Sequence, residues 1–155
     1  MLFANEVKQF AHSVGGDLVG IASAESLAKA QGYAPTDLLP TAKSVVVVGK
    51  RALKGFIMPG KGRAVSWGMI HLNLKLNEIC YEVSKYIEDR GHMALPVFFI
   101  YQTFLKPNTP TFTAILDTKW FSYIAAASQA GLGEIGFNSL LLTPEYGAMI
   151  RLTAV

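Results

Sequence analysis

The stretch SQAGLGEIGFNSLLLTPEYG, late in the chain, holds residues that could bind a ligand through the backbone. Gly131, Gly133 and Gly136 spell G-x-G-x-x-G. This spacing cradles a nucleotide pyrophosphate when a strand precedes the glycines and a helix follows them. Here the sequence predicts the reverse order, a helix over 119–130 and then a strand over 139–143. The motif therefore does not predict a dinucleotide site.

Two interpretations of these glycines remain open. In the first, Gly131 directly follows the predicted helix, where a positive φ is favoured, and the segment forms a helix cap and a tight helix-to-strand loop. In the second, closely spaced glycines let the backbone approach a large flat ligand, with main-chain N–H and C=O groups as the contacts.

The cysteine and the histidines indicate no metal centre. Cys80 is the only cysteine, and its place in a predicted helix indicates a buried, unreactive thiol. A single cysteine cannot hold an iron–sulfur cluster, which takes about four thiolates. His12, His71 and His92 are far apart in the sequence and lack the spacing of zinc ligands.

The basic residues gather in one segment only. The net charge is +3, and GKRALKGFIMPGKGR contains Lys50, Arg51, Lys54, Lys61 and Arg63. Such a segment is either a solvated loop or a contact for an anionic ligand or an acidic partner. Because no basic stripe interleaved with aromatic residues is present, the sequence does not favour nucleic acid as a partner.

The composition predicts a single apolar domain, residues 1–155. Hydrophobic residues make up 51% and charged residues 16% of the chain, yet its apolar runs are shorter than the roughly 20 residues of a membrane-spanning helix. The N-terminus does not have the pattern of a signal peptide. We therefore expect a cytoplasmic protein that does not enter membranes, with apolar surface covered by a partner, a second copy or a large cofactor.

The hydrophobic periodicity predicts helices that alternate with buried strands. Four consecutive valines in the strand over 38–50 indicate burial on both faces, as in a central strand. The other predicted elements are a helix over 2–14 ended by Gly15 and Gly16, a strand over 17–24, a loop over 49–62, a helix over 66–90 capped by Gly91, a strand over 92–101, and two strands over 139–144 and 148–155 joined by a turn. This order predicts an α/β or α+β layered domain.

The C-terminal segment AGLGEIGFNSLLLTPEYGAMIRLTAV resembles epoxyqueuosine reductases and reductive-dehalogenase-like iron–sulfur proteins. In those families an AGLG-x-x-G-x-N stretch and a PEYG turn belong to the cobalamin-binding domain. The segment GGDLVGIASAESL…LPTAKSVVVVGK is similar to their N-terminal half, and the Asp117–Thr118 pair precedes AGLG as their DT pair does. The resemblance is strong over 117–155 and looser over 50–110.

The resemblance implies a nitroreductase-like fold, with a central mixed sheet flanked by helices, and cobalamin as the cofactor. Asp117 corresponds to the aspartate proposed to donate a proton to substrate, which requires burial that keeps the carboxyl partly protonated. Alternatively, Asp117 is the N-cap of the following helix. The cofactor-facing residues implied by the resemblance are Gly131, Gly133, Gly136 and Asn138, with Tyr146, Ser66 and Trp67 as further candidates.

The sequence departs from the family pattern in three places. Family members continue into a ferredoxin-like domain with iron–sulfur clusters, whereas this chain ends at Val155. We therefore expect the cobalamin-binding domain alone, with electrons from the missing domain or a separate donor protein. Ile124 stands where epoxyqueuosine reductases have a basic residue, which weakens the implication of a tRNA substrate. GRAVSWGMIH keeps Arg63 but lacks the acid of the family's GRDYH region.

Three functions follow from these observations and stay open at this level. The chain is a corrinoid-binding domain of a redox enzyme, a non-catalytic corrinoid carrier or assembly module, or a flavin-binding nitroreductase-like enzyme. The sequence gives no substrate. Strand edges left exposed by an absent domain would also favour a homodimer.

Overall fold

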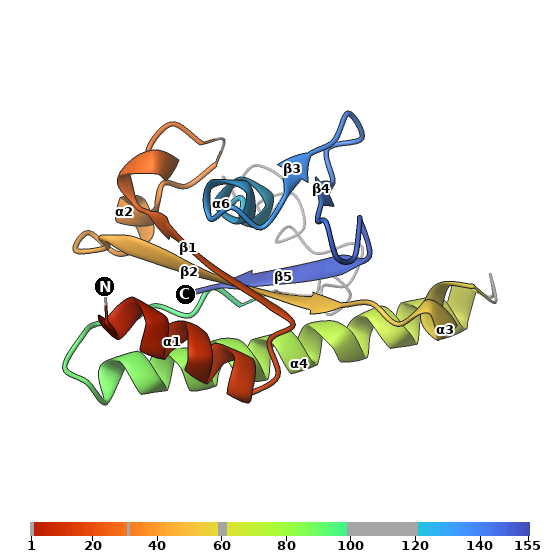
Figure 1. The fold of residues 1–155 in the computed structure, drawn as a ribbon, viewed down its shortest axis with the longest axis horizontal. Coiled ribbons are helices and arrows are strands. Elements are labelled where there is room, and N and C mark those ends of the chain that lie inside the picture. Colours follow the sequence, from red (N-terminus) through yellow and green to blue (C-terminus); the bar gives the residue numbers. More distant parts are fainter. Residues whose placement is uncertain (1, 31, 59–61, 99–120) are drawn as a thin grey trace, which may run out of the picture.

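A three-stranded antiparallel sheet lies between two layers of helices in the computed structural model (Figure 1). The structure describes residues 2–30, 32–58, 62–98 and 121–155. The sheet has the order β1-β2-β5, and both neighbouring pairs are antiparallel. Its strands are β1 (Leu18–Ser23), β2 (Ser44–Arg51) and β5 (Ile150–Ala154).

The central strand, β2, is buried on both faces, as the run of valines predicts. Successive side chains of a strand point to opposite faces. Val45 and Val47 belong to the hydrophobic cluster on one side of the sheet, and Val46 and Val48 belong to the cluster on the other side. Each face of β2 therefore needs its own layer of helix.

The helices α1 (Leu2–Ser13) and α4 (Gly62–Glu88) form one of these layers (Figure 1). Val7 of α1 and Val83 of α4 are buried in the cluster that contains Val46 and Val48. The predicted helix ends are confirmed: the Gly16 N–H donates to the Ala11 carbonyl at 2.9 Å, and the Gly91 N–H donates to the Glu88 carbonyl at 2.9 Å. The N-terminus of α4 lies earlier than predicted, at Gly62.

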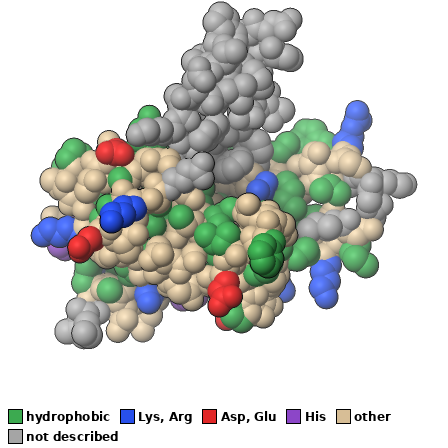
Figure 2. Space-filling model, turned by 90° about the horizontal axis from the view of Figure 1, so that it is seen from above, with side chains coloured by type: hydrophobic (Ala, Val, Ile, Leu, Met, Phe, Trp, Pro, Cys, Tyr) green, Lys and Arg blue, Asp and Glu red, His purple; other side chains and the backbone are tan. Residues whose placement is uncertain are grey.

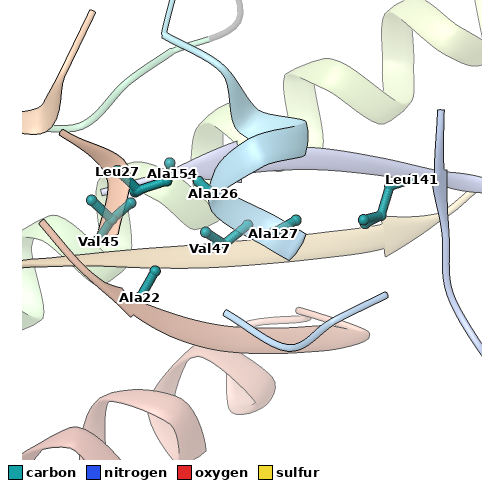
Figure 3. Close-up of a cluster of buried hydrophobic side chains, with 8 residues drawn as sticks. All are labelled: Ala22, Leu27, Val45, Val47, Ala126, Ala127, Leu141 and Ala154. Atoms are coloured by element: carbon teal, nitrogen blue, oxygen red, sulfur yellow. The ribbon is translucent and has the colours of Figure 1, made fainter. Parts of the chain in front are cut away.

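The opposite face of the sheet carries α6 (Tyr123–Gln129). Ala126 and Ala127 of this helix are fully buried and pack with Ala22 and Val47 of the sheet (Figure 3). Their small side chains let the helix lie close to the strands. The N-cap of α6 is Ser122, whose side chain accepts a hydrogen bond from the Ala125 N–H at 3.2 Å. Asp117 is therefore not the N-cap of α6.

The two predicted C-terminal strands and the turn between them are confirmed, although both strands are shorter than predicted and belong to different sheets. β4 (Leu141–Leu142) pairs with β3 (Glu134–Ile135) in a separate two-stranded sheet, and β5 pairs with β2 instead. A tight turn over 143–147, closed by two backbone hydrogen bonds between Thr143 and Gly147, separates β4 from β5. The expected mixed sheet is also not found, since every strand pair in the described ranges is antiparallel.

Other segments differ from the predicted elements in smaller ways. In the part of 92–101 that the structure describes there is no strand, only a single bridge from Val97 to Ala154 at the edge of β5. The predicted loop over 49–62 includes the end of β2 and a short helix, α3 (Lys54–Ile57). Two further short helices connect β1 to β2, namely η1 (Glu25–Leu27) and α2 (Pro35–Leu38). None of the helices within the described ranges is long and apolar enough to cross a membrane.

Substitution of β2 tests the burial of both its faces. We expect Val47→Ala and Val48→Ala each to lower the free energy of unfolding by about 2 kcal/mol, because each removes methyl groups from a filled core. Ser44→Ala, at the exposed start of the same strand, serves as the control and should change it little. Urea unfolding measures all three. A strand with one solvated face would show a loss for only one of the two valines.

Candidate functional site

The glycine segment forms a helix cap followed by a β-hairpin. Gly131 has a φ of 74°, a left-handed conformation that favours glycine. Its N–H donates to the Ser128 carbonyl at 3.0 Å, and the Leu132 N–H donates to the Ala127 carbonyl at 3.0 Å. This pair of hydrogen bonds closes the end of α6 and directs the chain into β3.

The two later glycines are required by close contacts inside the hairpin. A Cβ atom on Gly133 would collide with the carbonyl group of Leu142. A Cβ atom on Gly136 would lie 2.9 Å from Oδ1 of Asn138 and 3.0 Å from Cδ1 of Leu142. Oδ1 of Asn138 itself accepts a hydrogen bond from the Leu140 N–H at 3.2 Å. The packing of the hairpin therefore explains Gly133, Gly136 and Asn138.

Of the two interpretations of the glycines, the cap and tight loop is confirmed. The loop contains a β-hairpin, which the sequence interpretation did not include. The sides of Gly133 and Gly136 that lack a side chain are turned toward Leu142. A flat ligand therefore cannot approach the hairpin backbone from those sides, although nothing lies within 4 Å of the corresponding position on Gly131.

The hairpin carries an exposed apolar surface that the sequence analysis missed. Phe137, at the turn, is fully exposed, and Ile135 is 52% exposed. Leu140 and Leu142 are 46% and 43% exposed. We call these four residues the hairpin patch. Figure 2 looks down on this side of the molecule, where hydrophobic side chains stand at the surface. The sequence signal that could have revealed this surface is the number of large apolar residues in a glycine-rich segment that is expected to form a turn.

The structure does not bring the remaining candidate residues together around the hairpin patch. Ser66 and Trp67 are exposed residues of α4, which covers the opposite face of the sheet from α6 (Figure 1). Tyr146 is partly buried in the turn that follows β4, where its N–H donates to Oγ1 of Thr143 at 3.1 Å. Asp117 lies outside the described residues. Its role as a proton donor stays a prediction.

The basic segment does not form a shared anion site among the described residues. Nζ of Lys50 donates to the Gly15 carbonyl at 2.6 Å and lies 3.8 Å from the carboxylate of Asp17. The same carboxylate accepts a hydrogen bond from the Arg51 N–H at 2.8 Å. Lys50 thus stabilises the end of α1 on β2. Lys54 and Arg63 are exposed, and Lys61 lies outside the described residues.

The one cysteine is buried and unreactive, as predicted. Sγ of Cys80 donates to the Ala154 carbonyl at 3.1 Å, and burial raises the pKa of its thiol. The hydroxyl of Tyr123 donates to the Val97 carbonyl at 3.2 Å. Burial, and next the charge that a Cys80 thiolate would carry, raise the pKa of Tyr123 to about 12. Within the described ranges, no group of three or more His, Cys, Asp or Glu residues could hold a metal ion.

Similarity to known proteins is found in both sequence and fold. No protein-family model matches the chain. A stretch of 53 residues, 33% of this chain, is 42% identical to an epoxyqueuosine reductase from Listeria monocytogenes, of which it covers 14%. A crystal structure of a selenomethionine-labelled epoxyqueuosine reductase matches over 99% of this chain with a TM-score of 0.60 and 18% identity.

Two further solved structures show the same fold. An epoxyqueuosine reductase with an epoxyqueuosine-modified tRNA stem loop has a TM-score of 0.57. The enzyme from Bacillus subtilis, described with its catalytic loop swung out of the active site, has a TM-score of 0.53. Their identities to this chain are 18% and 17%. The chain covers only 44% of the length of each of these structures.

These comparisons confirm the resemblance to epoxyqueuosine reductase that the sequence indicates. The α+β arrangement of helices and antiparallel strands is the fold that the chain shares with those enzymes over 99% of its length. The chain spans less than half of the length of each enzyme, so the similarity shows a shared fold and does not show that the chain has the activity of the whole enzyme.

The raised pKa of Tyr123 predicts a loss of stability at high pH. A folded-state pKa of about 12, against an ordinary value of 10.0, means that the stabilisation is complete below pH 10 and is lost as the pH rises toward 12. The absorbance of tyrosine phenolates is measured as the pH is raised. We expect Tyr123→Phe to remove the part of the absorbance increase that appears at the highest pH. Tyr81→Phe, which alters an exposed tyrosine, should leave that component in place. A late component that survives Tyr123→Phe would contradict the assignment.

Substitution of Gly133 tests the close contact inside the hairpin. We expect Gly133→Ala to lower the free energy of unfolding by about 1–3 kcal/mol, since the added Cβ collides with backbone that cannot move independently. Gly55→Ala is the matched control, because nothing lies within 4 Å of a Cβ at that position in α3. Urea unfolding measures the free energy of unfolding of both variants. If Gly133→Ala lowers it no more than Gly55→Ala does, the close contact at Gly133 is refuted.

Proposed function

We propose that this chain is a corrinoid-binding domain of a reductase related to epoxyqueuosine reductase. The observation that carries the proposal is the hairpin patch, which displays large apolar side chains on the segment AGLGEIGFNSLLLTPEYG. A group of exposed apolar side chains on one short segment is typical of a binding surface, whereas exposed apolar residues that occur singly are common on folded proteins. The fold shared with epoxyqueuosine reductases supports the same class of protein.

The chemistry of the hairpin patch fits a corrin ring better than it fits a phosphate. A corrin is a wide, flat ring with an apolar face and amides at its rim. The exposed side chains of Phe137, Leu140 and Leu142 are suited to cover such a face. The register pairs Ile135 with Leu141, which sets Ile135 on the opposite face of the hairpin from Leu142. Asn138, which is also exposed, carries an amide N–H group that can donate to a rim amide. The ligand contact is thus assigned to side chains, while Gly133 and Gly136 shape the hairpin beneath it.

The roles of this chain's residues follow from that contact. When bound, a reduced cobalt supplies the electron pair for the reaction. The hairpin patch would hold the ring and exclude water from the part of it that the patch covers. Asp117 is proposed to donate a proton to substrate, because it corresponds by resemblance to the aspartate with that proposed role in epoxyqueuosine reductases. The electrons must come from outside the chain, because Cys80 alone cannot bind a cluster.

Cobalamin binding tests the proposal directly. We expect the purified chain to bind cobalamin, with a shifted visible spectrum and a calorimetric signal, and to bind flavin mononucleotide far more weakly. Phe137→Ser should weaken cobalamin binding about tenfold or more, because it removes the most exposed apolar side chain of the hairpin patch.

The control for this experiment is Met93→Ser, which removes an apolar side chain that is 72% exposed in the segment after α4. It should leave cobalamin binding unchanged. Failure of the wild-type chain to bind cobalamin would refute the proposed function. Unchanged binding by Phe137→Ser would refute the assignment of the hairpin patch alone.

A further inference from the structure

A cavity of about 430 Å³ lies at the end of the sheet where β2 begins and β5 ends, next to α2 (Figure 1). Its walls come from α1, from α2 and the residues after it, from the start of β2 and from the segment that follows α4. None of the four residues of the hairpin patch lines it. The cavity is therefore separate from the surface proposed to bind cobalamin.

Buried residues of both hydrophobic clusters line this cavity. Val45 belongs to the cluster on the α6 side of the sheet, and Val7 and Val46 belong to the cluster on the side of α1 and α4. Protein cores ordinarily contain few voids larger than a water molecule. An apolar cavity of about 150 Å³ already binds benzene. This cavity is larger and lies within the range of about 300–1,000 Å³ that is typical of small-molecule sites.

Small residues leave the space open, and large apolar side chains form the rest of its walls. Ala4, Ala42, Gly91 and Ala94 all line the cavity. Gly91 has a φ of 80°, and nothing lies within 4 Å of the position that a Cβ atom would occupy there. The large apolar residues of the lining include Phe3, Leu38, Leu39, Ile87 and Phe121. The interior is therefore suited to a hydrocarbon or aromatic group.

The ionisable groups at the cavity are basic. Lys43 and His92 both line it and are exposed, and the lining among the described residues contains no Asp or Glu. The backbone of Lys43 is fixed beside the cavity, because its carbonyl accepts a hydrogen bond from the Ala24 N–H at 2.9 Å. The ring of His92 lies against the ring of Phe3, with 4.8 Å between the ring centroids. Within the described ranges, neither Lys43 nor His92 forms an ion pair.

We propose that this cavity binds an apolar carboxylic acid, such as a medium-chain fatty acid. The hydrocarbon lies inside the cavity, where its removal from water supplies most of the affinity. The carboxylate lies at the exposed edge of the cavity and accepts a charge-assisted hydrogen bond from Nζ of Lys43. A ring N–H of His92 is a second donor. The absence of acids from the described lining favours an anion over a cation of the same length.

This inference does not depend on the proposed cofactor. The cavity and the hairpin patch share no residue, so a variant that alters one leaves the other intact. Binding of the acid is therefore measured on the full chain without cobalamin. Failure of the acid to bind would leave the cobalamin proposal standing, and failure of cobalamin to bind would leave this inference standing.

Calorimetric titration with three ten-carbon probes, each below its micelle concentration, tests the selectivity. We expect decanoate to bind and decyltrimethylammonium to bind at least about fivefold more weakly, because the cation meets like charge. Lys43→Met should weaken decanoate at least about threefold and leave the binding of decanol unchanged. Lys29→Met, which removes an exposed lysine away from the cavity, is the matched control. No binding of decanoate, or equal affinity for decanoate and the cation, would overturn the inference. Unchanged decanoate binding by Lys43→Met would refute the role of Lys43.

Filling the cavity tests its location separately. Ala42→Trp should abolish the binding of both decanoate and decanol, because the indole occupies the space that the hydrocarbon needs. Ala94→Leu fills the same cavity from the segment after α4 and should weaken both probes. Ala28→Trp alters an exposed alanine that does not line the cavity and should change neither. Circular dichroism confirms that each variant is folded. Normal decanoate binding by folded Ala42→Trp or Ala94→Leu would overturn the inference.

Discussion

The rest of the structure depends on the burial of β2 on both of its faces. Successive valines of β2 point to opposite faces of the sheet and belong to two different hydrophobic clusters. One layer of helices can bury only one of these faces, so a second layer is needed for the other. The chain supplies α1 and α4 on one side and α6 on the other. In the part of the chain that the structure describes, the three-stranded sheet then separates two hydrophobic clusters.

The elements that local sequence signals specify could be predicted, and their pairing could not. The valine run gave β2, the helical stripes gave α1 and most of α4, and glycines marked where both helices end. The pairing of β4 with β3 is closed by the turn over 136–140, where the Gly136 N–H donates to the Leu140 carbonyl at 2.9 Å. The sequence showed two apolar runs there without showing which partner each would choose.

The structure shows what the predicted glycines do in the fold, while their contact with a cofactor stays a prediction. Glycine spacing suggested a backbone surface for a ligand, and the structure uses Gly133 and Gly136 to let the hairpin strands pack on each other. The sequence analysis placed Leu140 and Leu142 in a strand over 139–143 and gave no role to Ile135 and Phe137. A two-residue strand pair has no core of its own, so those side chains remain at the surface.

Exposed apolar side chains account for part of the apolar composition of the chain. Hydrophobic residues make up 51% of the sequence. Among the described residues, the large exposed ones lie on the hairpin, on α4 and elsewhere: Trp67, Leu74 and Tyr81 belong to α4, and Leu53, Met58, Met93, Leu95 and Phe98 belong to neither element. The hairpin differs from the rest because its four exposed apolar residues fall within residues 135–142, which concentrates the surface proposed to hold a ligand in one short segment.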